Sequence, residues 1–279
     1  MIKKTTSQQS KIYLTQESRS EWTFEFPRLD ERAYALFHEA LEYFDIGNYG
    51  KAEKELQLLL EGFPEFIDVA HHLAIIFDET GRHKEAKRLW EVAVEMGLSA
   101  LPRAFKRGRH KLPWVILENR PFLRVYHSWG LLLLKEKKVT EAVTVFKEIL
   151  SMNPNDNQSI RSLVIDSYFQ LGQPDQVLAT CRRFRNDTIE EVLYGRPLAL
   201  FQLQREQEAR TALLQAIDIL PLIAEELVKK SHRPPKNFNP HFITIGGNDQ
   251  AYYYWRRNGQ YWEKTNGALQ FVASVLTLR

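Results

Sequence analysis

A helical pattern that recurs after 34 residues constrains the fold of this chain more than any other feature. The segment Gly47–Ala52 aligns with Gly81–Ala86, 34 residues later, and apolar residues three or four apart flank both segments. This spacing places apolar side chains along one stripe of an α-helix, and a glycine after such a stripe is typical of a helix C-cap. Each unit is therefore predicted to be a helix, a tight turn and a second helix.

The same pattern fits three further segments, which run over 123–156, from 158 onward and from 190 onward. Small residues stand where the two helices of a pair would cross most closely, because a larger side chain would push the helices apart: Ala52, Ala86, Ala142 and Ala209. A period of this length is the mark of a solenoid. We predict an all-α chain with repeats one and two over 33–97 and repeats three to five over 123–221.

Two repeats depart from the pattern. In repeat four, Val177 replaces the expected alanine, and the second helix is predicted to end early, near Asn186. In repeat five, Pro197 lies inside the first helix, where it removes a hydrogen bond to the carbonyl of Leu193. We expect a kink or a late start of that helix.

On these residues the chain resembles the tetratricopeptide-repeat (TPR) family over about two thirds of its length. The resemblance implies a right-handed superhelix whose concave wall is formed by the first helix of each unit, mainly at its second, fifth, sixth, ninth, twelfth and thirteenth positions. A chance amphipathic bundle, the alternative, would not give five matches in one register. The register predicts a partner-binding groove that includes Tyr34, Phe37, His38, Asp68, His71, His72, Arg124 and His127.

A second resemblance concerns the C-terminal half of the chain. The stretches LPWVILENRPFLR, NPNDNQ and YWEKTNGALQFV, within Leu112–Phe271, resemble bacterial TPR proteins related to the suppressor-of-tumorigenicity family. This resemblance implies no particular biochemical activity.

The segments at the two ends of the chain do not follow the repeat. Residues 1–32 are predicted to be an N-terminal tail and arm, in which the alternation of Trp22, Phe24 and Phe26 indicates an extended arm against the first helix pair. Residues 222–232 are predicted to contain a capping helix, because a solenoid needs a polar-faced end. Residues 233–279 are predicted to be an aromatic helical extension, which Asn258-Gly259 and Asn266-Gly267 divide into short helices.

A basic insert separates repeats two and three, over residues 98–122. We expect a short helix near Arg103–Arg107 and then a packed turn, since a long loop without structure is unusual in a compact domain. A basic loop is more often a solvated surface or a surface for an acidic partner than a nucleic-acid site. The basic side chains most relevant to such contacts are Arg103, Lys106, Arg107 and Arg109.

Several classes of function are excluded by what the sequence lacks. The net charge of +3 is too small to indicate nucleic acid or a membrane surface by itself, and no run of 18 apolar residues occurs. One cysteine, Cys181, rules out a disulfide framework, and its place on a core position makes it a buried hydrophobe. No phosphate-binding loop or nucleophile elbow is present. We expect a cytoplasmic protein without catalysis, cofactor or membrane partner.

The histidines of the predicted groove leave a metal site to consider. His38, His72 and Asp68 could together contact zinc, because imidazole and carboxylate groups suit that ion. The set is incomplete, so a polar groove wall is the favoured interpretation and no metal is predicted. TPR proteins that bind chaperone tails use lysines and asparagines on this wall, whereas this chain has Phe37, His38 and His72 there. The resemblance therefore argues against a chaperone C-terminal tail as the ligand.

Two functions agree with these features. The first is a protein–protein interaction scaffold that holds an extended or helical segment of another protein in the groove. The alternative is a nucleic-acid-associated protein that uses the basic insert, with the aromatic C-terminus assisting. The first is favoured.

Overall fold

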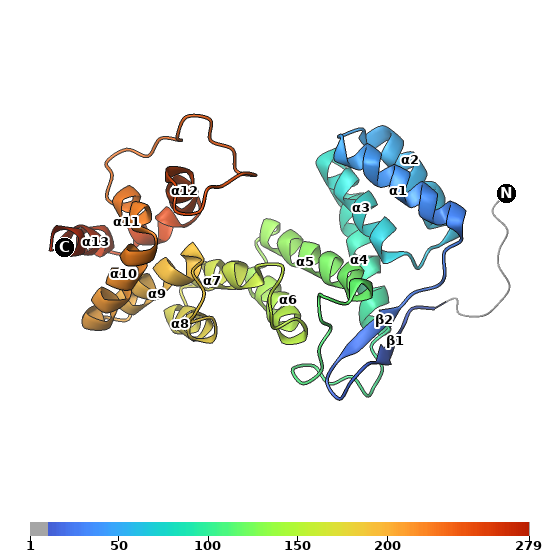
Figure 1. Cartoon of the computed structure of the whole chain (residues 1–279), viewed down its shortest axis with the longest axis horizontal. Coiled ribbons are helices and arrows are strands. Elements are labelled where there is room, and N and C mark those ends of the chain that lie inside the picture. The colour runs from blue at the N-terminus through green and yellow to red at the C-terminus, as the bar shows by residue number, and fades with distance from the viewer. Residues whose placement is uncertain (1–10, 279) are drawn as a thin grey trace. The chain divides into compact units, whose positions relative to one another are not determined.

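The computed structural model describes residues 11–278, which form thirteen α-helices and a single two-stranded sheet (Figure 1). The chain divides into two compact units, with the boundary between Ile160 and Arg161. The predicted all-α, TPR-type fold is confirmed: unit 1 contains three antiparallel helix pairs, and unit 2 contains two helix pairs and the C-terminal helices.

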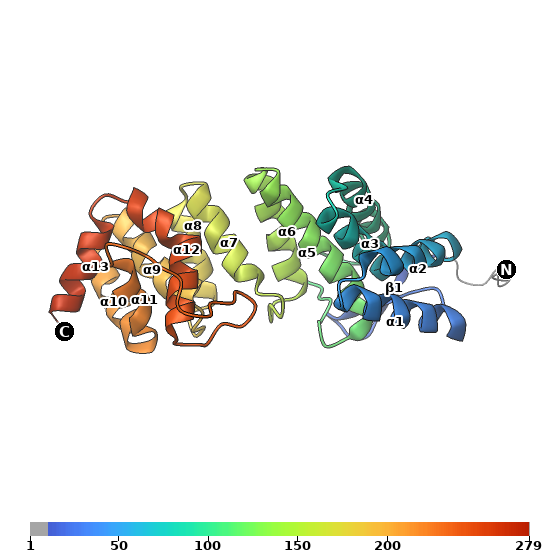
Figure 2. The same ribbon diagram turned by 90° about the horizontal axis from the view of Figure 1, so that it is seen from above.

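The helix pairs of unit 1 are α1 with α2, α3 with α4, and α5 with α6 (Figure 2). Gly47 and Gly81 take the left-handed conformation, with φ of 72° and 81°, directly after the first helices of two pairs. They confirm the predicted C-caps, since only glycine takes this conformation without a steric penalty. The helices span Glu31–Asp45 (α1), Tyr49–Gly62 (α2), Ile67–Glu79 (α3), His83–Ser99 (α4), Arg120–Lys135 (α5) and Val139–Met152 (α6).

Small residues lie at the helix crossings, as the repeat predicts. Ala52, Ala86, Ala142 and Ala209 are all fully buried. In the third pair Gly130 packs so closely on Phe146 that a β-carbon at Gly130 would overlap the ring. The small side chains at these repeated positions thus allow the two helices of each pair to pack closely.

The N-terminal arm is a β-hairpin, which the sequence analysis did not predict. Strand β1 (Tyr13–Gln16) pairs antiparallel with β2 (Trp22–Glu25), with Leu14 opposite Phe24. The hairpin does not lie on the first helix pair as expected. Trp22 contacts Phe105 of the insert, and the Asn119 side chain accepts from the Phe24 amide and donates to the Trp22 carbonyl. The predicted N-terminal tail includes residues 1–10, which lie outside the described residues.

The basic insert is built from turns, and the helix expected at Arg103–Arg107 is absent from it. Its backbone is instead bonded to the hairpin: the Lys111 amide donates to the Ser20 carbonyl, and the Trp22 amide donates to the Lys111 carbonyl. A 3-10 helix, η1 (Leu117–Asn119), leads directly into α5. These inter-segment bonds satisfy the polar backbone groups that a helix would otherwise satisfy internally.

Unit 2 contains the remaining repeats and the C-terminal extension. Helix α8 is short, as predicted for repeat four, and α9 begins at Glu190 and runs through Pro197, so the alternative of a late start is wrong. A helix is present in the predicted capping segment, but this helix, α11, is short and ends at Leu227. The helices are Ile160–Gln170 (α7), Pro174–Arg183 (α8), Glu190–Gln202 (α9), Glu206–Ile219 (α10), Pro221–Leu227 (α11), Asn248–Lys264 (α12) and Ala268–Thr277 (α13).

The predicted division at Asn258-Gly259 is wrong, because α12 continues through it. Asn258 is buried, and the Trp255 ring occupies the space that a β-carbon at Gly259 would need. The glycine therefore allows a close ring contact instead of a turn. The second predicted division is confirmed: Gly267, with φ of 81°, separates α12 from α13.

Candidate functional site

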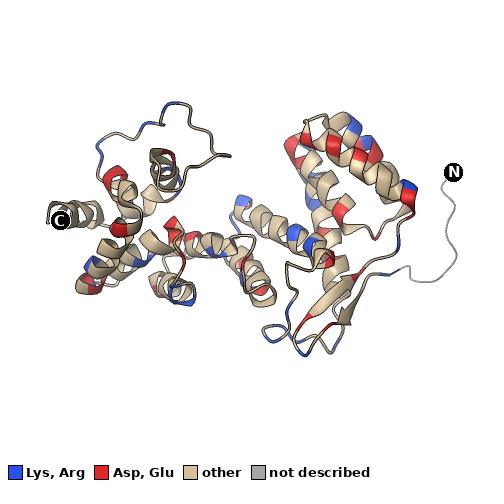
Figure 3. Cartoon of the chain, in the orientation of Figure 1, with Lys and Arg blue, Asp and Glu red and all other residues tan. Residues whose placement is uncertain are grey.

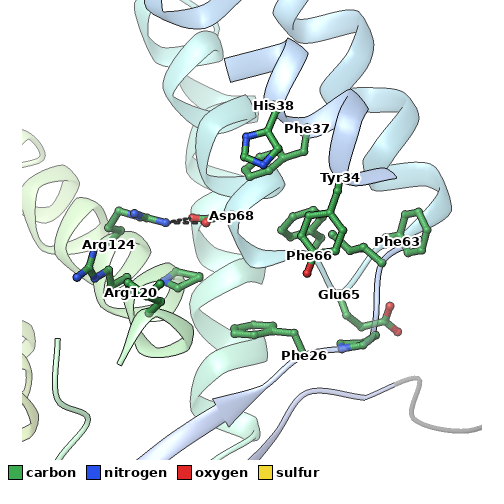
Figure 4. Close-up of a pocket in the computed structure, with 14 residues that line it drawn as sticks. Phe26, Tyr34, Phe37, His38, Phe63, Glu65, Phe66, Asp68, Arg120 and Arg124 are labelled. Carbon is green, nitrogen blue, oxygen red and sulfur yellow. Dashed lines mark hydrogen bonds and ion pairs between the residues drawn. The ribbon is translucent and has the colours of Figure 1, made fainter. Parts of the chain in front are cut away.

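An open cavity of about 430 Å³ lies in unit 1, where α1, the beginning of α3, the beginning of α5 and the segment after β2 meet (Figure 4). A cavity of this size can hold a few side chains of a bound peptide. We call it the α1–α5 pocket. Its walls are predominantly apolar and are formed by Phe26, Pro27, Leu29, Tyr34, Phe37, His38, Phe63, Glu65, Phe66, Asp68, Leu117, Arg120, Pro121 and Arg124.

Aromatic side chains from α1 and from the turn before α3 form one wall. Phe37 is buried and its ring packs on Phe66, with centroids 4.8 Å apart. Tyr34, one helical turn before Phe37, is 52% exposed and faces the same space. An exposed aromatic beside a packed aromatic pair offers a partner side chain a preformed apolar contact.

The opposite side of the pocket carries two arginines of α5 (Figure 4). Nη2 of Arg124 donates to both carboxylate oxygens of Asp68, at 2.7 and 2.6 Å. Nε of Arg120 donates to the Trp114 carbonyl at 2.9 Å, and its guanidinium lies over the Trp114 ring. The arginine side is thus partly neutralised and held in place by neighbouring groups.

Five of the eight predicted groove residues line this pocket: Tyr34, Phe37, His38, Asp68 and Arg124. The structure places the other three in the packing behind it. His72 lies against Phe44 and Phe37, and its Nδ1 is 2.7 Å from the Asp68 carbonyl.

His71 and His127 are enclosed between helices. Burial lowers the pKa of His71 to about 3, and it also lowers the pKa of His127. Both imidazoles are therefore neutral near pH 7 and serve the packing of α3 and α5.

The zinc alternative finds no support in the geometry. Within residues 11–278, no three His, Cys, Asp or Glu side chains gather closely enough to hold a metal ion. Both oxygens of Asp68 bond to Arg124, and Nδ1 of His72 faces a backbone carbonyl. Cys181 is buried, and burial raises the pKa of its thiol to about 12, which suits a core residue and not a nucleophile.

Several pocket residues were not predicted, because they lie outside the first helices of the repeats. Phe26, Pro27 and Leu29 follow the hairpin, while Leu117 and Pro121 belong to the insert and the start of α5. The repeat register assigns no position to them. The apolar and proline-containing stretches at both places were the available signal that these segments fold onto the repeats.

The basic insert lies on the surface of unit 1, with basic positions along its loop (Figure 3). Arg103, Lys106, Arg107 and Arg109 are all exposed. Nη1 of Arg107 pairs with Glu148 at 2.8 Å, and the Lys106 ammonium donates to the Arg103 carbonyl. Arg107 and Lys106 therefore already have partners within the protein.

Helix pairs with a period of 34 residues and alanines at the crossings define a TPR protein. Three solved structures are similar. A tetratricopeptide repeat protein from Parabacteroides merdae ATCC 43184 is 14% identical, covers 89% of this chain and 80% of its own, and has a TM-score of 0.53. The MamA RS-1 ArsTM double mutant is 13% identical over 68% of this chain and 96% of its own, with a TM-score of 0.51. YrrB, a TPR protein with an unusual peptide-binding site, is 17% identical over 68% and 87%, with a TM-score of 0.49.

A family model matches almost the whole of the described chain. The model of the family described as "Transcriptional repressor TCF25" matches residues 22–277, so this chain belongs to the TCF25 family. The match includes every residue of the α1–α5 pocket. This helical family is compatible with both resemblances seen in the sequence. None of the curated proteins matches the chain.

No helix within residues 11–278 has the length and apolar character needed to cross a membrane.

Proposed function

We propose that this chain is a non-catalytic interaction scaffold that binds an apolar segment of another protein in the α1–α5 pocket. The main support for this proposal is the pocket itself, an open apolar cavity that contains the half-exposed Tyr34. It is built on the groove-forming helices of a TPR unit. Peptide grooves of this kind recognise extended or helical segments through a few side-chain anchors.

The electrostatics of the pocket favour a protein over a nucleic acid. Nucleic-acid affinity depends on neutralising phosphates with free lysine or arginine side chains. In the pocket Arg124 is paired with Asp68. Glu65 balances the charge of Arg120, so the lining has no excess of positive charge. An apolar segment with few charges matches this lining better than a polyanion does.

The family description places the TCF25 proteins in transcriptional repression. A repressor can act through protein contacts alone, so a transcription-related role agrees with a protein-binding pocket. We therefore propose a role within an assembly of proteins, with a partner that is not a chaperone C-terminal tail. We also propose a cytoplasmic location, which suits the single reduced cysteine.

The proposal is tested by cross-linking within the full chain. A photoreactive amino acid replaces Leu117, which is exposed and lines the pocket, and a control chain carries it at Val92, which is exposed on α4 outside the pocket. Proteins captured by the first chain and not by the second are candidate pocket partners. Each candidate is then purified and tested for direct binding.

Two matched substitutions decide whether the pocket is the binding site. Tyr34→Asp makes the pocket polar at an exposed position, and Leu58→Asp makes the same kind of change on α2, away from the pocket. We expect Tyr34→Asp to remove the cross-link and Leu58→Asp to preserve it. Equal loss in both variants, or capture that Tyr34→Asp leaves unchanged, contradicts the proposal.

A further inference from the structure

In unit 2, the surface that corresponds to the groove wall is covered by the chain itself. Helices α7 and α9 are the first helices of repeats four and five. The repeat register places Asp166 and Phe169 of α7, and Glu191 and Tyr194 of α9, on the wall that in unit 1 faces the pocket. Each of these four side chains contacts α12.

Tyr261 joins α12 to α7 through both its hydroxyl and its ring. Its hydroxyl donates to Asp166 Oδ1 at 2.6 Å. Its ring stacks on Phe169, with centroids 5.2 Å apart and planes inclined by 21°. The ring and the hydroxyl of this one residue therefore contact an apolar and an acidic position of the wall.

Further contacts join α12 to α9. Nη1 of Arg257 lies 3.3 Å from Oε1 of Glu191, a carboxylate that is 4% exposed. The Tyr254 ring packs against Tyr194, with centroids 5.6 Å apart. The Gln250 amide donates to Glu190 at 2.9 Å.

The residues of α12 that make these contacts occupy one face. Positions 250, 254, 257 and 261 are spaced by three or four residues, which places them along one stripe of a helix. An amphipathic helix that lays such a stripe into a groove is a recurring mode of peptide recognition. Helix α12 thus lays this face on repeats four and five in the manner of a bound peptide, while it also packs along α11.

A long connection joins this helix to the repeats. Residues 228–247, between α11 and α12, contain turns but no helix or strand, and most of their side chains are exposed (Figure 1). The segment includes Lys229, Lys230, Arg233 and Lys236, and it contains no acidic residue. Because this segment links α12 covalently to the repeats, it keeps α12 at a high effective concentration beside α7 and α9.

We propose that α7 and α9 form a helix-binding groove, that α12 fills it as an intramolecular ligand, and that a partner helix with the same aromatic and arginine face binds there when α12 is released. This inference is independent of the α1–α5 pocket. The contacts of Arg257 and Gln250 and the hydroxyl contact of Tyr261 are polar, so water can replace them when α12 leaves. Because Trp262 is fully buried, the closed form dominates in the unmodified chain.

The experiment uses the full chain and a fluorescent peptide of residues 248–264 as the probe, with binding followed by fluorescence anisotropy. Arg257→Glu places a carboxylate beside Glu191 and weakens the internal contact. Arg256→Glu is the matched control, because Arg256 is exposed and lies over the Phe238 ring, away from Glu191. We expect the Arg257→Glu chain to bind the unmodified peptide at least about tenfold more tightly than the unmodified chain and the Arg256→Glu chain do.

A second pair of measurements makes each result decisive. The peptide that carries Arg257→Glu should fail to bind any of the chains, since it lacks the partner of Glu191. If circular dichroism shows that Arg257→Glu disrupts unit 2, Tyr261→Phe replaces it, because it removes only the hydroxyl bond to Asp166. The inference is overturned if no folded weakened chain binds the peptide more tightly than the unmodified chain does.

Discussion

Asp68 and Arg124 form an ion pair that joins two consecutive repeats of unit 1. They lie 56 residues apart and occupy equivalent positions of the repeat register, Asp68 as the second residue of α3 and Arg124 as the fifth residue of α5. Asp68 is 8% exposed and accepts two hydrogen bonds from one nitrogen of Arg124. Because this pair lies at the pocket, it connects the stacking of the repeats to the shape of the binding site.

Removing the carboxylate is expected to destabilise unit 1. Asp68→Asn leaves Arg124 next to the pocket without a counter-charge, and we expect a loss of roughly 1–2 kcal/mol in the free energy of unfolding, since Arg124 is partly solvated. Urea denaturation measures it. Glu208→Gln is the control, because its pair with Arg205 is exposed to solvent and should contribute little to stability. If Asp68→Asn destabilises the chain no more than Glu208→Gln does, the Asp68–Arg124 pair adds nothing to stability.

The crossing alanines give a test of the helix packing. Ala86→Trp inserts a large ring where α3 and α4 cross, and overpacking of this kind costs roughly 1–3 kcal/mol or more. We expect a lower thermal midpoint. Ala35→Trp, at an exposed position on α1, should leave the midpoint nearly unchanged. An unchanged midpoint for Ala86→Trp would contradict the packing described here.

Glu191 should make the stability of unit 2 depend on pH. Burial, assisted by the charge of Glu190 and opposed by Arg257, raises its pKa from 4.5 to about 7. The folded state therefore keeps a proton that the unfolded chain has already lost, and this stabilising contribution is complete below about pH 4.5 and lost as the pH rises through 7.

The measurement compares urea denaturation of the unmodified chain and of Glu191→Gln at several pH values. Relative to the variant, the unmodified chain should lose on the order of 3 kcal/mol between about pH 5 and pH 8. A difference that is constant over this range, or that grows in favour of the unmodified chain, would show that Glu191 is charged throughout.

The basic insert provides the test of the nucleic-acid alternative. If Arg103, Lys106, Arg107 and Arg109 bind phosphates, affinity for single-stranded RNA or DNA should fall steeply with salt, and the slope should shrink when all four are replaced by Gln. We expect only weak binding that the replacement hardly changes, because Arg107 is already paired with Glu148. Micromolar, salt-sensitive binding that is lost in the variant would establish the alternative.

The repeat architecture was predictable because close helix crossings admit few residue types. Ala52 and Ala86, together with Gly47 and Gly81, record the period directly in the sequence, and the structure confirms each of them. The groove residues on α1 followed from the same register. The position of a residue within the repeat thus predicts whether its side chain packs in the core or lies on the groove side of the helix.

The hairpin and the insert were not predictable from this register, because their partners are distant in sequence. Asn119 bonds to the backbone of β2, at sequence separations of 95 and 97 residues. The turn predicted at Asn258-Gly259 is absent for another reason: the dipeptide favours a turn locally, but Gly259 instead accommodates the Trp255 ring within a helix. Tertiary packing overrides local preference at such sites.

The most direct test of the central claim is the dissociation constant of a purified partner segment, identified by cross-linking, for the unmodified full chain and four variants of it. The account predicts that Tyr34→Asp and Phe37→Ala each weaken binding at least about tenfold, because anchors in an apolar pocket carry most of the binding energy. Leu58→Asp and the four-site insert variant should bind like the unmodified chain. A dissociation constant that is unchanged by both pocket substitutions but raised by the insert variant would contradict the account.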